Sequence, residues 1–306
     1  METIRIPNSA TYSPVALTDL MLAAPVASRL LLGATLPGRL LQAAAFGAYA
    51  GSVVGDWASR RGVRKVEFLA TFGADVKHLD PMSEDQRLDD AMKHLSELVS
   101  IYRPVERNRE ALAADVNERL TSYLAGITGQ RVETSSSVRE MTLASLIMPY
   151  AVGSCDILSG DIAVFQSTGV FEAHILAHEF CHRKGYFKEL EAQALAYLAL
   201  VSSRDERLRQ AALAERVYRN LRVLDGGDPD RYEELVEDSP LDGPLKENFL
   251  KLRPASDKGG WFGKTMRDVY DSRMKLTGQN GLSDYDQGFT DFLFTYEAAR
   301  REGRVA

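Results

Sequence analysis

Hydrophobic residues recur at helical spacing along most of the chain. Residues 83–102 and 104–126 show this best, and in the second segment Leu112, Val116, Leu120 and Leu124 fall on one helix face. Ser83, followed by two acidic residues, has the pattern of a helix N-terminus. Further helices are expected over residues 187–201, 204–224, 231–237, 245–252, 262–277 and 284–301.

Short runs with strand character lie in the middle of the chain. Residues 131–134, 148–153 and 161–165 show the alternation of strands, and turn residues lie between them. Residues 1–13 and 66–82 are expected to be irregular connections. The sequence therefore predicts an α+β fold that is mainly α, with a small sheet just before residue 170.

The N-terminal part differs in composition from the rest. Residues 15–54 are rich in Leu, Ala and Gly, and the uncharged run 40–55 is shorter than the roughly twenty residues of a spanning helix. We expect an apolar helical hairpin, either docked on protein or in contact with a membrane through residues 15–55. If it spans a membrane, the basic residues at 60, 61, 64 and 65 place the remainder on the cytoplasmic side. Two domains are expected, 1–65 and 66–306.

Overall composition narrows the functional classes. A formal net charge of -6 gives no basic surface for nucleic acid. Two cysteines cannot form a disulfide framework. The first residues lack the apolar core of a signal peptide. A cytoplasmic protein is therefore expected, with or without membrane association, and the oligomeric state stays open.

The segment 174–200 carries the strongest chemical signal. Residues 178–182 read His-Glu-Phe-Cys-His, a complete H-E-x-x-H motif. On a helix, residues four apart lie on one face, so His178 and His182 can bind one metal ion. Glu179 points about a quarter-turn away, where it can accept a proton from a metal-activated water. The motif therefore predicts a zinc hydrolase.

A zinc site of this kind needs a third protein ligand. Gly185, after two basic residues, predicts a helix end, and the next helix opens with Glu189 and Glu191. These carboxylates are two residues apart, so only one is expected to reach the metal. Glu189 is favoured, because in many zinc peptidases the third ligand begins the pattern Glu-x-x-Ala-(Asp/Asn), and residues 189–193 read Glu-Leu-Glu-Ala-Gln. Gln193 is then expected to support a metal-binding histidine.

Two further residues have more than one interpretation. His174 lies one helical turn before His178 and is either a surface or core histidine, or a residue near the metal or substrate. Tyr150 is either an ordinary strand aromatic or a hydroxyl that stabilises a tetrahedral oxyanion. Cys181, between the two histidines, is expected to be a small buried residue and not a ligand.

Three separated segments resemble a bacterial family of HExxH zinc metallopeptidases that is catalogued as a domain of unknown function. The family pattern His-Glu-x-x-His-Gln-x-Gly-Phe, followed by Glu-Asp-Glu-Ala-Asn, resembles residues 178–193. A Gly-Glu-Ala strand resembles residues 160–163, and a pattern with Tyr-x-Asp, Gly-Gln and Ser-Tyr resembles residues 269–285. The resemblance covers about residues 95–300. It implies a zincin-like fold with a glutamate as third ligand, and no known substrate.

These observations predict a zinc-dependent metallopeptidase that hydrolyses a peptide or protein substrate. Glu179 is expected to be the general base and then the proton donor to the leaving amine. The alternative is a non-catalytic scaffold or sensor that binds metal on a zincin-like fold. A third hypothesis, a helical interaction protein without metal, is separated from both by metal analysis.

Overall fold

Helices form most of the structure. This computed structural model describes residues 1–8, 15–104, 108–140, 152–156, 160–254, 268–269 and 271–305. The strands among these residues form two small two-stranded sheets. The predicted α+β, mainly α, fold class is therefore confirmed. The chain divides into two compact units: unit 1 comprises residues 1–65, 108–167 and 175–185, and unit 2 comprises residues 66–107, 168–174 and 186–306.

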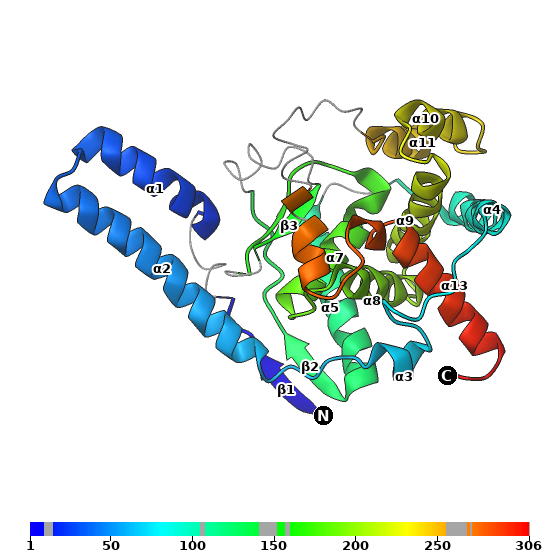
Figure 1. The fold of residues 1–306 in the computed structure, drawn as a ribbon, viewed down its shortest axis with the longest axis horizontal. Helices are drawn as coiled ribbons and strands as arrows, with labels where there is room; N and C mark the ends of the chain where they lie inside the picture. The colour runs from blue at the N-terminus through cyan, green and yellow to red at the C-terminus, as the bar shows by residue number, and fades with distance from the viewer. Residues whose placement is uncertain are drawn as a thin grey trace. The chain divides into compact units, whose positions relative to one another are not determined.

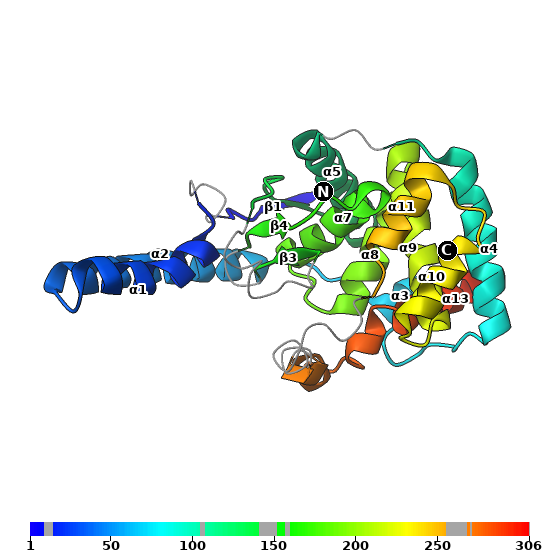
Figure 2. The same ribbon diagram turned by 90° about the horizontal axis from the view of Figure 1, so that it is seen from above.

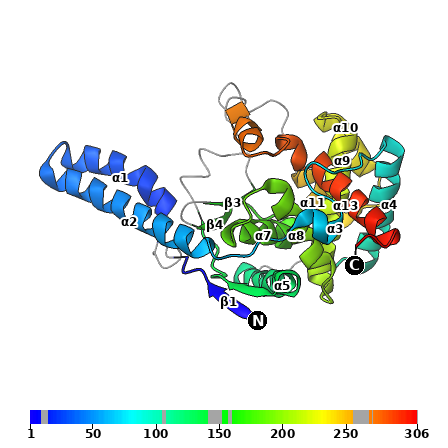
Figure 3. The ribbon, with the colours of Figure 1, turned by 60° about the horizontal axis from the view of Figure 1, so that its bottom comes forward.

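The predicted N-terminal hairpin is part of unit 1. It consists of two helices, α1 (Leu17–Leu32) and α2 (Leu36–Arg60). Gly33 ends α1 with a φ of 60°, a conformation that glycine adopts readily. Thr35 caps α2 by accepting a hydrogen bond from the Gly38 N–H. Figures 1 and 3 show the two helices side by side and antiparallel. Of the helices that the structure describes, none combines the length and apolarity needed to cross a membrane.

One sheet of unit 1 joins distant parts of the chain. β1 (Glu2–Arg5) pairs in parallel with β2 (Gln130–Glu133), so the prediction that residues 1–13 are irregular is wrong for β1. β2 directly follows α5 (Arg109–Thr128), which Asn108 caps at its start and Gly129 ends. The side chains of Ile6, Val63 and Val132 form a small core here. The partner of β1 lies so far along the chain that no local pattern reveals the pairing.

The second sheet lies against the helix that carries the metal-binding motif. β3 (Gly153–Cys155) pairs antiparallel with β4 (Ile162–Val164). A Cβ added at Gly153 would lie 2.7 Å from Ile175 Cγ2 on α7 (Glu172–Arg183), so β3 packs directly on α7. The predicted strands at 131–134 and 161–165 are thus confirmed, and the expected sheet is beside the motif helix. Most of the predicted strand 148–153 lies outside the described residues.

Unit 2 is a set of helices packed around α8 and α9. The apolar sequence of α8 (Glu189–Val201) is buried on nearly all sides, and this helix packs on α9 (Glu206–Leu224). Figure 2 shows α9 among its other neighbours α4 (Glu84–Ile101) and α13 (Gln287–Arg301). Other elements of unit 2 are α3 (Phe68–Phe72), which occupies part of the expected connection 66–82, α10 (Pro229–Glu237), α11 (Gly243–Lys251), and the short helices η2 (Gly169–Phe171) and η3 (Leu282–Asp284). Residues 271–276, within the predicted helix 262–277, are also helical.

Candidate metal centre

The motif helix α7 ends where the glycine pattern predicts. Gly185 has a φ of 95°, and its N–H donates to the His182 carbonyl at 2.8 Å. A side chain at Gly185 would be strained at this φ and would lie 2.7 Å from Lys65 Nζ. That ammonium donates to the Gly185 carbonyl at 2.6 Å. The chain therefore turns tightly after α7, and α8 begins four residues later at Glu189.

The two motif histidines face each other on α7. His178 and His182 are both buried, their Nε2 atoms are 3.0 Å apart, and their ring planes are nearly perpendicular. Two imidazole nitrogens bound to one tetrahedral zinc ion, at about 2.0–2.1 Å each, are about 3.3 Å apart. The observed separation therefore suits the binding of one ion by both rings.

Glu189 completes a group of three ligand atoms. One atom from each of His178, His182 and Glu189 lies within 4.8 Å of the other two, and all three residues are buried. The Glu189 N–H donates to Gln279 Oε1 at 2.7 Å. Gln279 therefore caps α8, because the side chain of the N-cap residue Lys188 makes no capping hydrogen bond. Two imidazole nitrogens and one carboxylate oxygen are a donor set for zinc and similar ions. This group, named the ligand cluster below, could hold a metal ion.

Glu179, the carboxylate of the motif, is separate from the ligand cluster. It is buried, and its Oε1 atom would lie 3.1 Å from a Cβ added at Gly153. The glycine in β3 therefore leaves the space that the Glu179 carboxylate needs. Glu179 is thereby held between α7 and β3, next in sequence to the candidate ligand His178.

Glu191, Gln193 and His174, also singled out from the sequence, are not part of the ligand cluster. Glu191 forms an ion pair with Lys188 at 2.9 Å. Gln193 Nε2 donates to Glu215 Oε1 at 2.5 Å, and the same carboxyl group lies 3.7 Å from His174 Nδ1. Tyr150 lies outside the described residues. Of the two candidate third ligands, the structure thus brings Glu189 and not Glu191 to the histidines. Cys181 is fully buried, as expected.

The structure contains a partly buried ionic network on α9 that the sequence did not indicate. Arg219 Nε donates to Glu215 Oε1 at 2.6 Å, and Arg219 Nη1 donates to Asp286 Oδ1 at 2.7 Å. Burial opposes ionisation of Glu215, but Arg219 and His174 outweigh it and hold the pKa of this carboxyl below its usual value. Glu215 also accepts from Gln193, so this network fixes α8 one turn after Glu189. In the sequence, Glu215 and Arg219 form an ordinary i,i+4 pair, and only the packing shows that Glu215 is buried and Arg219 partly buried.

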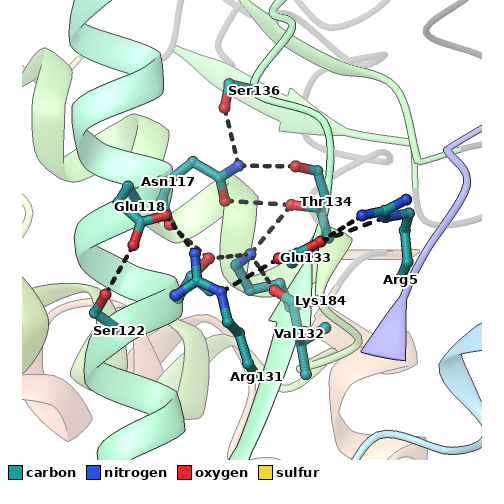
Figure 4. A network of polar contacts seen from close by, with 11 residues as sticks. Arg5, Asn117, Glu118, Ser122, Arg131, Val132, Glu133, Thr134, Ser136 and Lys184 are labelled. Atoms are coloured by element: carbon teal, nitrogen blue, oxygen red, sulfur yellow. Dashed lines mark hydrogen bonds and ion pairs between the residues drawn. The ribbon is translucent and has the colours of Figure 1, made fainter. Parts of the chain in front are cut away.

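Two cations at the end of α7 are also buried, although the sequence suggested only a basic helix end. Figure 4 shows the Lys184 side chain directed at Val132 and Thr134. Its Nζ atom donates to Thr121 Oγ1 at 2.8 Å, to the Val132 carbonyl at 3.0 Å and to Thr134 Oγ1 at 3.1 Å. Arg183 donates to the backbone carbonyls of Gly160, Ser135 and Ser137. Burial lowers the pKa of Lys184 to about 7 and that of Arg183 to about 10. These bonds fix the end of α7, one and two residues after His182.

Comparison with known proteins places the chain in one family. A family described as "Protein of unknown function (DUF3810)" matches residues 81–294, a range that contains α7, α8 and the whole ligand cluster. Among curated proteins and solved structures, none matches the chain. Because the matched range spans more than half of the 306 residues, the protein belongs to this family.

Proposed function

We propose that the protein is a zinc-dependent metallopeptidase with a zincin-like domain. The observation that carries this proposal is the ligand cluster of His178, His182 and Glu189. Catalytic zinc sites use three protein ligands and keep one position open, whereas structural zinc sites are closed by four. The three donors, all buried and all from one short stretch of chain, support the catalytic type.

Glu179 is the residue that would move protons in this mechanism. A zinc ion held by the ligand cluster would lower the pKa of a water molecule and polarise the carbonyl of the scissile peptide bond. Glu179 would accept the proton of the attacking water and then donate it to the leaving amine. Its burial between α7 and β3 limits the positions that its carboxylate can take, which favours a directed proton transfer.

The strand β3 favours an extended peptide or protein as substrate. Within the described residues β3 pairs with β4 along one edge, and its other edge pairs with no named strand. A free strand edge can bind an extended backbone through main-chain hydrogen bonds without reading its sequence. Because β3 lies beside Glu179, a peptide bound along this edge would pass close to the proposed base. The net charge of -6 argues against nucleic acid as a partner.

The first test is the metal itself. Native mass spectrometry of wild type reconstituted with zinc should find about one zinc ion per chain, and His178→Ala should lose it, because an open site with two remaining ligands binds zinc weakly. Glu191→Gln is the matched control, since Glu191 pairs with Lys188 outside the cluster, and it should keep the metal. A wild type that binds no zinc would rule out this function.

The second test separates catalysis from metal binding. Glu179→Gln keeps the size of the side chain and all three candidate ligands, so it should retain zinc. It should lose about 10²–10⁴-fold in the rate at which a peptide library is cleaved, the contribution typical of a general base. Zinc-loaded wild type that cleaves no peptide would favour the scaffold or sensor alternative. Full cleavage by Glu179→Gln would contradict the proposed role of Glu179.

A further inference from the structure

The α1–α2 hairpin exposes many apolar side chains near its turn. Residues 26–41 are named the hairpin tip here. The side chains of Leu30, Leu31 and Leu36 are 80%, 81% and 70% exposed. Leu30, Leu31 and Leu32 are consecutive, so they project about 100° apart around α1. The exposed apolar surface therefore surrounds the tip and does not form a single stripe. Other exposed apolar residues of the tip are Val26, Leu40 and Leu41.

The contact between the two helices is built from small and polar side chains. Gln42 Nε2 donates to Ser28 Oγ at 2.6 Å across the hairpin. A Cβ added at Gly38 would lie 3.2 Å from the Gly33 carbonyl oxygen, so the backbones approach closely there. A hairpin that folds in water turns its leucines toward the partner helix, whereas this one turns them outward. The buried residues of the hairpin above its base are Ala24, Ser28, Gly38, Ala45 and Ser52.

Between Asp19 and Asp56, the charges of the hairpin are few and of one sign. Between Asp19 and Asp56 the only charged residues are Arg29 and Arg39, and both are exposed. Each lies four residues from the connection between the helices, Arg29 before Gly33 and Arg39 after Thr35. The two guanidinium groups therefore lie about one helical turn from the end of the hairpin, where they match the anionic headgroups of a lipid surface.

We propose that the hairpin tip inserts into one leaflet of an anionic lipid bilayer and attaches the protein to it. Small and polar residues between helices, with leucines outside, are the arrangement of helices surrounded by lipid. A protein partner would bind one apolar stripe, and the tip offers no single stripe. Because the chain turns back at residues 33–35, between α1 and α2, the tip enters from one side. This attachment needs no metal, so its test is independent of the proposed peptidase activity.

Co-sedimentation of the full chain with lipid vesicles tests the proposal. Wild type should bind vesicles of phosphatidylcholine mixed with phosphatidylserine. The combined variant Leu30→Ser, Leu31→Ser, Leu36→Ser should bind at least about tenfold more weakly, because apolar area drives insertion. Its control changes three exposed apolar residues of α4 in the same way, Leu88→Ser, Met92→Ser and Val99→Ser. This control should bind like wild type, and circular dichroism should show both variants folded.

A second variant tests the role of charge. Arg29→Gln with Arg39→Gln should weaken binding to the mixed vesicles several-fold and leave binding to pure phosphatidylcholine unchanged, because only the anionic surface attracts the arginines. Wild type that stays in the supernatant with both vesicle types would overturn the proposal. Equal binding by wild type and the leucine variant would overturn it too. A wild-type dimer that binds no vesicles, and that the leucine variant converts to monomer, would show that a second copy covers the tip.

Discussion

The helices that carry the candidate metal ligands are held by two cations in opposite chemical environments, the buried Lys184 and the partly buried Arg219. At the end of α7, Lys184 donates to two hydroxyls and a carbonyl, all neutral. On α9, Arg219 donates to the carboxylates of Glu215 and Asp286. Burial lowers the pKa of Lys184 to about 7. Burial also disfavours the charge on Arg219, but the two carboxylates outweigh it and raise the pKa of this guanidinium.

The difference shows that burial alone does not decide whether a charge stabilises a fold. Neutral oxygens satisfy the hydrogen bonds of Lys184 but return only part of the hydration energy that its charge loses. Carboxylates replace much more of this hydration energy. Removing either partner, however, leaves the charge of the other without compensation. The stability that the α9 network gives should therefore be sensitive to the loss of one member. The stability that depends on Lys184 should instead be sensitive to pH.

The largest effect is expected from Arg219→Met. It leaves the Glu215 carboxylate buried without its closest cation, and should lower the free energy of unfolding by about 3–5 kcal/mol, measured by urea denaturation. Arg231→Met is the control, because its pair with Glu234 is exposed, and it should cost less than about 1 kcal/mol. Adding Glu215→Gln to Arg219→Met should recover part of the loss. Equal costs for the two arginine variants would show that the α9 network is not stabilising.

A smaller effect is expected from Lys184→Met, measured in the same way at pH 7. The change removes three hydrogen bonds but also removes a charge that burial disfavours, so the net cost should be below about 2 kcal/mol. The acceptors left behind are neutral, which distinguishes this variant from Arg219→Met. A cost as large as that of Arg219→Met would mean that the Lys184 charge itself stabilises the fold.

The cap of α8 should affect metal binding. Gln279→Ala removes the acceptor of the Glu189 N–H, so the first turn of α8 is held less firmly and the zinc affinity should fall about tenfold, or about 1.4 kcal/mol. Competition with a chromophoric zinc chelator measures this change. The exposed Gln287 at the start of α13 gives the control Gln287→Ala, which should bind zinc like wild type. Unchanged affinity in Gln279→Ala would show that this cap does not position Glu189.

The smallest effect is a pH dependence due to Lys184. Its pKa is about 7 in the folded protein and 10.5 in the unfolded chain, so between these values the unfolded chain binds more protons. The free energy of unfolding then rises with pH in this window. From pH 7 to 8, wild type should gain about 1 kcal/mol relative to Lys184→Met. Parallel pH profiles for the two proteins would exclude a buried, titrating lysine.

The parts of the structure that the sequence predicted best are those coded by neighbouring residues. The glycine after α7, the four-residue spacing of His178 and His182, and the apolar run of α8 each specify a helix or its end locally. The preference for Glu189 over Glu191 also agrees with the ligand cluster. Gln193 was expected to support a histidine that binds metal, and its bond is with Glu215. That bond depends on how α9 packs on α8, which no spacing within one helix reveals.

By itself, the sequence determined the mainly helical α+β class, the N-terminal hairpin, and the helix–turn–helix that carries the candidate ligands. These features follow from periodicity, caps and glycine, which act over a few residues. The tertiary structure decided which distant groups meet: β1 with β2, Gln279 with the start of α8, and Glu179 with Gly153. It also decided that the leucines of the hairpin face outward. Burial and partner choice depend on packing between distant segments, and a linear pattern does not record that packing.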